Sequence, residues 1–192
     1  MINRLKKRGF TLVETLVAVL LLATAIAGPL TIESKSLNAA LVAKNQVVAF
    51  YLAQDAVEYV RFARDTNRLQ NGNWLIGAGG ADPSKIINLS PCLGASGCFF
   101  DSTGGTPPAP AACPMSGTGG CNNSSASVTK FLYYNTTNGR YSYDSVETLT
   151  NTKQIYVRTV YITTNTANTE ATLVVRVYWT DISGAVHPPV TV

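Results

Sequence analysis

Three residues near the N-terminus have types and spacing suited to charge chemistry: Gly9, Phe10 and Glu14. Gly9 stands between a basic stretch and an apolar run, and the pattern places a processing point there rather than after the apolar run, where an ordinary secretory signal is cut. Cleavage after Gly9 creates a positive α-amino group on Phe10. Glu14 then lies one helical turn from that amine, and at the same membrane depth as the amine of a neighbouring copy. The spacing therefore predicts an ion pair between two copies of the chain.

Glu14 is a single charge within an apolar run. Residues 10–30 comprise 21 residues with one charge, and a helix of that length spans about 30 Å, the thickness of one hydrocarbon core. A carboxylate inside such a span costs about 2.5–3.5 kcal/mol on insertion scales, and such residues are usually paired. The alternative is a carboxylate that reaches the cytoplasmic headgroups from the helix end. No Lys or Arg of the run offers a partner within one copy.

Basic residues precede the apolar run, namely Arg4, Lys6, Lys7 and Arg8. The positive-inside rule places residues 1–9 in the cytoplasm and the rest of the chain outside. The formal charge of +4 comes from 15 basic and 11 acidic residues, so a chain without this leader carries 11 of each. The excess of basic over acidic residues thus belongs to the leader, and it gives no reason to expect a nucleic-acid-binding surface.

The segment Gly9-Phe10-Thr11-Leu12-Val13-Glu14 resembles the class III signal of type IV prepilins and type II secretion pseudopilins. The resemblance implies that a prepilin peptidase cleaves after Gly9 and N-methylates Phe10. It also implies that Glu14 pairs with the amine of Phe10 in an adjacent subunit. Residues 52–61 are similar to the second half of the helix in minor pilins of the V type and pseudopilins of the I type. A plain single-pass anchor is the alternative, and it explains the span but not the glycine or the glutamate.

Four cysteines lie in one loop-rich region, at Cys92, Cys98, Cys113 and Cys121. An exported domain meets oxidising conditions, and an even number of cysteines in such a segment favours disulfides. Of the three connectivities, we favour the local pairs Cys92–Cys98 and Cys113–Cys121. A four-cysteine zinc site is the alternative, but neither spacing is the gap of two to four residues that zinc sites normally use.

The sequence offers little for catalysis. His187 is the one histidine, and it stands beside two prolines without an acidic or nucleophilic residue nearby in the sequence, so we expect it on the surface. The glycine-rich stretches lack the lysine and the helix pattern of a phosphate-binding loop. We therefore predict a protein that is not an enzyme, has no cofactor or metal, and is itself the substrate of a peptidase.

The element that must position Phe10 and Glu14 is a long helix over residues 10–66. Residues 10–32 form its membrane half and residues 33–66 its amphipathic half, and Gly28-Pro29 predicts a kink. Phe50, Val57 and Val60 lie off the main apolar stripe, which predicts a second packing partner. The main stripe consists of Leu41, Val48, Leu52, Ala56, Tyr59 and Ala63.

The rest of the chain divides into a loop region at 67–130, an antiparallel sheet at 131–181 and an edge strand or tail at 182–192. Residues 131–134 and 140–143 predict a hairpin around Asn138-Gly139, and residues 155–164 and 171–180 predict two longer strands. The fold class is α+β, with a long helix on about four strands, which resembles the pilin fold. The apolar residues of the loop region, which we expect to pack on the domain, are Trp74, Leu75, Ile76, Ile86, Ile87, Leu89, Phe99 and Phe100.

Three functions remain open. The first is a minor structural subunit of a type IV pilus or a type II secretion pseudopilus. Its partners would be other pilin subunits, the prepilin peptidase and an inner-membrane assembly platform. It would cross the inner membrane once and then enter a periplasmic or extracellular filament. The second is an adhesive or DNA-uptake subunit, in which the Cys-bearing loop contacts a surface or Arg61, Arg64 and Arg68 contact phosphates. The third is a membrane-anchored ectodomain of another kind.

Overall fold

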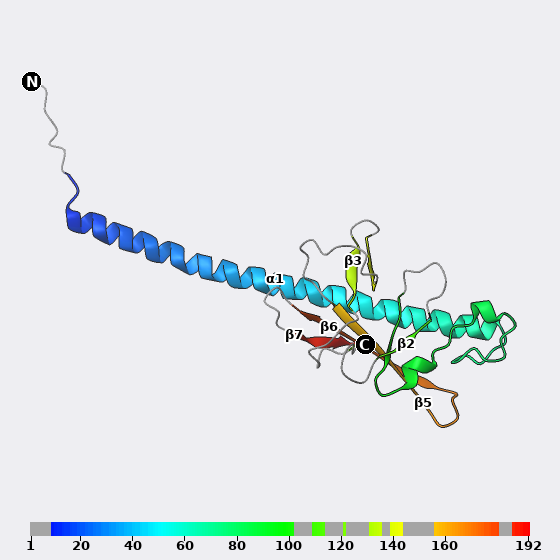
Figure 1. Cartoon of the computed structure of the whole chain (residues 1–192). Coiled ribbons are helices and arrows are strands. Elements are labelled where there is room, and N and C mark those ends of the chain that lie inside the picture. The colour runs from blue at the N-terminus through cyan, green and yellow to red at the C-terminus, as the bar shows by residue number, and fades with distance from the viewer. Residues whose placement is uncertain are drawn as a thin grey trace, which may run out of the picture. The chain divides into compact units, whose positions relative to one another are not determined.

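The computed structural model describes residues 9–101, 109–113, 121, 131–135, 139–143, 156–180 and 186–192. Helix α1 runs through Leu12–Leu69 and is followed by two short 3-10 helices and seven strands (Figure 1). The chain forms two compact units, Met1–Lys44 and Asn45–Val192. The described part of the first unit consists of the start of α1, and residues 9–41 are all exposed.

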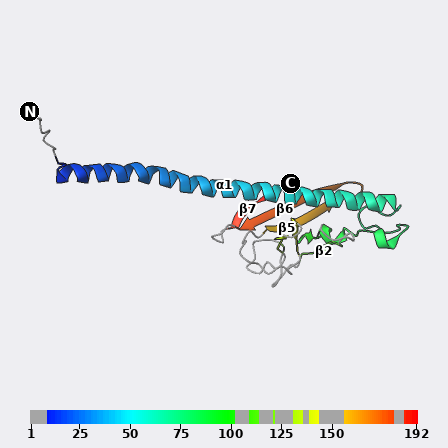
Figure 2. The same ribbon diagram turned by 90° about the horizontal axis from the view of Figure 1, so that it is seen from above.

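In the second unit, α1 packs on the sheet through one stripe of small and aromatic residues. Ala49, Ala53, Ala56 and Ala63 are fully buried, and their short side chains allow the sheet to approach closely. Tyr59 stacks on Phe100, with ring centroids 3.9 Å apart. The predicted stripe is thus confirmed from Leu52 onwards. Figure 2 shows this part of α1 lying along β5, β6 and β7.

Asn67 anchors the last turn of α1 to the segment that follows. Its side-chain Nδ2 donates to the carbonyl oxygens of Trp74 (3.1 Å) and Ile87 (2.8 Å), and its Oδ1 accepts from the Ile87 amide (3.0 Å). Asn67 is fully buried, so these bonds satisfy both ends of an amide that would otherwise be costly to bury. Leu75, Ile87, Leu89 and Phe100 are buried as expected, whereas Ile76 is 39% exposed, so its predicted packing is wrong.

The main sheet has five strands in the order β2-β1-β5-β6-β7, and every pair is antiparallel. Two longer strands form its centre, and they pair from Tyr156 opposite Trp179 to Thr164 opposite Ala171. The 3-10 helices are η1 (Pro83–Lys85) and η2 (Ser90–Leu93). The strands of this sheet are β1 (Cys98–Phe99), β2 (Ala111–Ala112), β5 (Tyr156–Thr164), β6 (Ala171–Thr180) and β7 (Val186–Thr191).

The prediction of about four strands in one sheet is corrected in two ways. Strands β1 and β2 come from the region predicted to be loop, because Cys98 pairs with Val160 and extends the sheet beyond β5. The predicted hairpin forms as β3 (Tyr133–Asn135) and β4 (Arg140–Ser142), but as a separate two-stranded sheet. One bridge, from Leu132 to Tyr156, connects it to β5. Asn138 lies outside the described residues, and Gly139 has the positive φ of +70° that a tight turn uses.

The final strand lies at the sheet edge. β7 contains Pro188 and Pro189, which lack amide protons, and its pairing with β6 is irregular between Val177 and Trp179. His187 is half-buried, and its ring stacks on that of Trp179 at a centroid distance of 5.4 Å and an interplanar angle of 6°. The expectation of a plain surface histidine is therefore wrong.

Both local disulfides form, with Cα–Cα distances of 4.5 Å for Cys92–Cys98 and 5.4 Å for Cys113–Cys121. All four cysteines are thereby consumed. A four-cysteine zinc site would require four free thiolates, and with both disulfides formed no cysteine is free. The first bridge connects η2 to β1, and the second connects the segment after β2 to Cys121, whose carbonyl accepts the hydroxyl of Thr159 on β5.

Three residues of α1 off the main stripe predicted a second packing partner, and two of the three pack within their own domain instead. Val57 and Val60 are half-buried against the core of their own domain. Phe50 remains 43% exposed, and an exposed face of α1 in the second unit also carries Val47, Tyr51 and Phe62.

Candidate processing and assembly site

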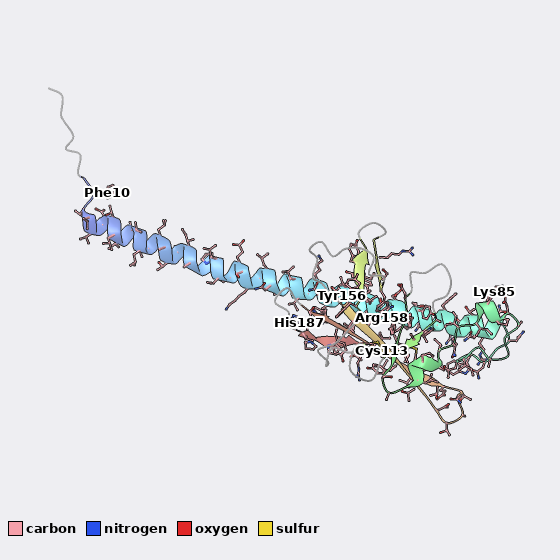
Figure 3. The ribbon with its side chains drawn as sticks, in the orientation of Figure 1. Phe10, Lys85, Cys113, Tyr156, Arg158 and His187 are labelled. Carbon is pink, nitrogen blue, oxygen red and sulfur yellow. A yellow bond between two sulfur atoms is a disulfide. The ribbon has the colours of Figure 1, made fainter. Side chains whose placement is uncertain are left out.

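The residues predicted to be cut and modified lie just before α1. Arg4, Lys6, Lys7 and Arg8 lie outside the described residues. Gly9 and Phe10 are exposed, and the Phe10 side chain is 81% exposed (Figure 3). A Cβ atom built on Gly9 would meet no atom within 4 Å. The backbone at the predicted cleavage point is therefore open to a protease.

Thr11 begins the helix. Its side-chain Oγ1 accepts from the backbone amide of Glu14 at 3.3 Å, and its carbonyl accepts from the amide of Thr15 at 3.2 Å. This is the start of a capping box, in which a threonine is followed three residues later by a glutamate. The sequence analysis missed this role, although the Thr-x-x-Glu spacing was there to indicate it. Thr11 thus fixes the place of Glu14 within the first turn.

The charge of Glu14 suits that position. The first turn of a helix exposes unpaired amide groups and carries a partial positive charge, which favours a nearby carboxylate. An α-amino group on Phe10 would add a full positive charge in the same region. The site therefore combines one exposed carboxylate with the positive end of its own helix, and with an amine once the leader is removed.

Apolar side chains surround Glu14 along the helix. α1 is the one described helix that is long and apolar enough to cross a membrane. Three threonine hydroxyls in the first half of α1 donate within the helix: Thr15 to the Leu12 carbonyl (2.9 Å), Thr24 to that of Leu21 (3.0 Å) and Thr31 to that of Gly28 (2.7 Å). The exposed apolar residues are Leu12, Val13, Leu16, Val17, Val19, Leu20, Leu21, Leu22, Ile26, Leu30 and Ile32.

Gly28 and Pro29 lie inside α1, which continues through both. Pro29 lacks the amide that would donate to the carbonyl of Ala25, so one backbone bond is missing from the helix at this point. The kink predicted here stays a prediction.

A family model described as the prokaryotic N-terminal methylation motif matches residues 4–28. This match supports a type IV pilin-like protein. Its class III signal implies processing by a prepilin peptidase and assembly with other pilins, and pilin-type proteins are generally structural. An apolar N-terminal helix with this signal fits anchoring in a membrane before assembly. No curated protein and no solved structure matches the chain.

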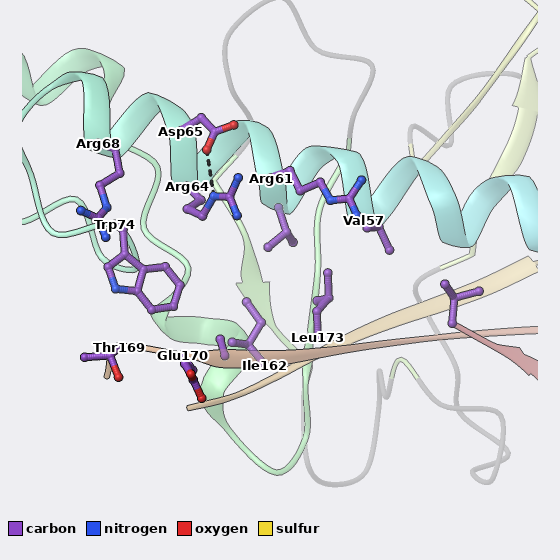
Figure 4. A pocket seen from close by; sticks show the side chains of 13 residues that line it. Val57, Arg61, Arg64, Asp65, Arg68, Trp74, Ile162, Thr169, Glu170 and Leu173 are labelled. Atoms are coloured by element: carbon purple, nitrogen blue, oxygen red, sulfur yellow. Dashed lines mark hydrogen bonds and ion pairs between the residues drawn. The ribbon is translucent and has the colours of Figure 1, made fainter. Parts of the chain in front are cut away.

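The second unit holds a groove beside the last turns of α1, with a volume of about 810 Å³ (Figure 4). It brings Arg61, Arg64 and Arg68 together, the three residues that the DNA-uptake alternative requires. However, Arg61 pairs with Glu58 at 2.7 Å and Arg64 with Asp65 at 2.8 Å. Asp65 and Glu170 also line the groove, so its electrostatics favour a polyanion only weakly.

Arg158 is a buried charge that the sequence analysis missed. It is 1% exposed on β5, between α1 and the sheet (Figure 3). Its Nη1 donates to the Leu52 carbonyl (3.0 Å) and to Asp55 Oδ2 (2.6 Å), and its Nη2 donates to the Phe100 carbonyl (3.0 Å). The sequence could have indicated its burial, because alternate residues of a strand lie on the same face and Arg158 lies between the buried residues Tyr156 and Val160 on that face. Its role is to connect α1, β1 and β5.

Among the described residues, no group of three His, Cys, Asp or Glu side chains is arranged to hold a metal ion.

Proposed function

We propose that the chain is a minor structural subunit of a type IV pilus or of a type II secretion pseudopilus. The observation that carries this proposal is the methylation motif at residues 4–28, placed on an exposed apolar helix whose first turn holds Glu14. A prepilin peptidase would cleave after Gly9 and N-methylate Phe10. The chain would then act as a building block rather than as an enzyme, without a cofactor.

The assembly step follows from charge. In the membrane, the carboxylate of Glu14 costs free energy because the hydrocarbon offers it no partner. Pairing with the α-amino group of Phe10 on an adjacent subunit would offset that cost, and both Phe10 and Glu14 are exposed and so accessible to another copy. Before assembly, residues 1–9 would lie in the cytoplasm and the folded domain outside. After assembly, the subunit would belong to a periplasmic or extracellular filament.

The processing experiment compares intact masses after expression with a prepilin peptidase. The wild-type chain should lose residues 1–9 and gain one methyl group. Gly9→Leu should retain the leader, because the peptidase must accommodate a bulky side chain at the cleavage point. Gly28→Leu is the matched control, since a Cβ at Gly28 also meets no atom within 4 Å, and it should be processed normally. Wild-type protein recovered from filaments with residues 1–9 still attached would refute the proposal.

A deletion strain separates the two machineries. Loss of piliation or twitching with normal protein export would identify a pilus subunit, and the reverse would identify a pseudopilus subunit. The amount of the chain in sheared filaments tests the minor role. If the chain is the dominant filament protein, that part of the proposal is wrong.

A further inference from the structure

The groove beside the end of α1 combines an apolar floor with a basic wall. Its floor is formed by Val57, Val60, Ile162 and Leu173. At one end lies Trp74, whose Nε1 donates to the Asn168 carbonyl at 3.0 Å and so holds the ring in place. Figure 4 shows the arginine side chains of α1 on the opposite side of the groove from Ile162 and Leu173. Its volume lies within the range of about 300–1,000 Å³ that is common for binding sites.

The charges of this groove select among ligands. Arg61 and Arg64 each have an acidic partner, whereas the guanidinium of Arg68 makes no ion pair or hydrogen bond within the described part of the chain. Asp65 and Glu170 would repel a chain of phosphates. The groove therefore suits a surface with several apolar side chains and one carboxylate, more than it suits a nucleic acid.

The chain itself carries such a surface in its first unit. Leu30, Glu33, Leu37 and Leu41 follow steps of three or four residues, so at 100° per residue they share one side of α1. All four side chains are exposed. This stripe is an apolar row with one acidic residue, and its 12 residues extend over about 16 Å of helix. The arginine wall from Arg61 to Arg68 extends over about 10 Å.

We propose that the groove of one copy binds the Leu30–Leu41 stripe of a second copy, with Glu33 opposite Arg68. The leucines would cover the apolar floor, and Glu33 would supply the acidic partner that Arg68 lacks among the described residues. This is a helix-in-groove contact, in which one helix lays its apolar side along a groove. The inference rests on the proposed function, because assembly through the helix is what brings copies together.

The first test is photo-crosslinking of the full chain, expressed together with its assembly machinery. A p-benzoyl-phenylalanine residue replaces Ala171, which is exposed and lines the groove. The expected product is an adduct of two copies whose crosslinked peptide contains residues 30–41. Adducts only to another segment, to a different protein or to DNA would overturn the proposal, and so would the absence of any adduct.

The second test exchanges the two charges. Arg68→Glu alone and Glu33→Arg alone should each lower the yield of this adduct on the order of fivefold or more, because each places like charges opposite one another. The double variant should restore the yield. Lys35→Glu, on the opposite side of α1 from Glu33, and Arg140→Glu, outside the groove, are the matched controls and should leave it unchanged. Failure of the double variant to restore the yield would contradict the Glu33 and Arg68 contact.

Intact mass and filament recovery, measured in the same samples, separate this inference from the proposed function. Wild-type protein that is processed and recovered in filaments, but gives no adduct within residues 30–41, would overturn the groove contact alone. Protein that retains its leader in filaments would overturn the proposed function.

Discussion

At Glu14 a single carboxylate is exposed in the first turn of an apolar helix, and Thr11 fixes its place through the capping bond. The proposed function thus gives the same residue an intermolecular role beside its local one. Locally it complements the positive end of the helix, which is worth a few tenths of a kcal/mol to about 1 kcal/mol. Between copies it would neutralise a full charge in an apolar environment, which is worth more because the alternative is an unpaired ion.

Glu14→Ala should therefore separate insertion from assembly. The variant should enter the membrane at least as well as the wild type, because the span loses its one charge. Its recovery in sheared filaments should fall at least about tenfold, which corresponds to about 1.4 kcal/mol. Immunoblots of membrane and filament fractions measure both quantities. Glu58→Ala, which removes an exposed carboxylate from the second unit, is the control, and equal recovery of the two variants would contradict the role of Glu14.

Arg158 differs from Glu14 because all of its described contacts lie inside one domain. Its guanidinium donates to two buried carbonyls, those of Leu52 and Phe100, and within α1 the Leu52 carbonyl also accepts from the amide four residues later. Arg158→Met keeps much of the side-chain volume but leaves these carbonyls without that donor. We expect a loss of about 2–4 kcal/mol in the free energy of unfolding. Urea unfolding of the full chain in detergent, followed by the fluorescence of Trp74 and Trp179, measures it.

Two further variants distinguish this explanation from a general effect of losing an arginine. Asp55 is 46% exposed on its side chain, so Asp55→Asn should cost less than Arg158→Met. Arg176 is exposed and lies over the ring of Tyr161, so Arg176→Met should cost under about 1 kcal/mol. An Arg158→Met variant as stable as Arg176→Met would exclude the proposed connecting role.

At the scale of elements, the turn before β1 depends on Gly97. Its φ is +70°, and a Cβ built there would lie 2.7 Å from Thr159 Cγ2 and 2.8 Å from the Val160 carbonyl oxygen. Gly97→Ala should lower the free energy of unfolding by about 2–4 kcal/mol, since a strained backbone and a clash with β5 add together. Gly79→Ala is the matched control. Its φ is +82° with no atom within 4 Å, so it should cost only about 1 kcal/mol in the same urea measurement.

The elements also show what sequence patterns could and could not predict. β5 and β6 were predictable because they are runs of nine and ten residues rich in β-branched and aromatic side chains, and in β6 the burial also alternates from Val175 onwards. β1 and β2 have two residues each, which is too short for any period to appear. They are strands because Cys98 of β1 pairs with Val160 at the edge of β5, and β2 pairs with β1 in turn. The pairing with β5 joins segments that are distant in sequence.

The same reasoning applies to the two sites. The N-terminal methylation motif could be predicted because Gly9, Phe10 and Glu14 are neighbours in sequence, and the motif at residues 4–28 is defined by such local spacing. The groove could not, because α1, Trp74 and the β5–β6 hairpin come together only in the folded domain. The arginine row indicated one side of a helix with Asp65 beside it, and only the structure added the apolar floor and Glu170.

At the scale of the whole molecule, buried tyrosines at the helix-sheet interface make stability depend on alkaline pH. Burial raises the pKa of Tyr59 to about 12, and burial also raises the pKa of Tyr156. In the unfolded chain both groups ionise near pH 10. Their contribution to stability is therefore fully present below pH 10 and is lost as the pH rises from 10 towards 12, because unfolding releases protons in that range.

The urea midpoint should accordingly fall more steeply above pH 10 than below it. In Tyr59→Phe the fall between pH 10 and 12 should be smaller, even though the variant keeps the ring that stacks on Phe100. Tyr51→Phe is the control, since Tyr51 is exposed on α1 and its change should leave the pH dependence as it is. A Tyr59→Phe variant with the full alkaline fall would show that other groups cause it.

The inward-directed hydroxyls of Thr15, Thr24 and Thr31 have a consequence for transfer of the subunit between environments. Each hydroxyl already has an acceptor on its own helix, so leaving lipid for a protein interior breaks none of these bonds and requires no replacement for them. Glu14 is the one ionisable side chain among residues 10–32, and its surroundings do change. In the proposed assembly, the electrostatic part of the free-energy cost of leaving the bilayer would thus be concentrated in the Glu14 carboxylate, and the subunit would stay in the lipid until a cation is available to pair with it.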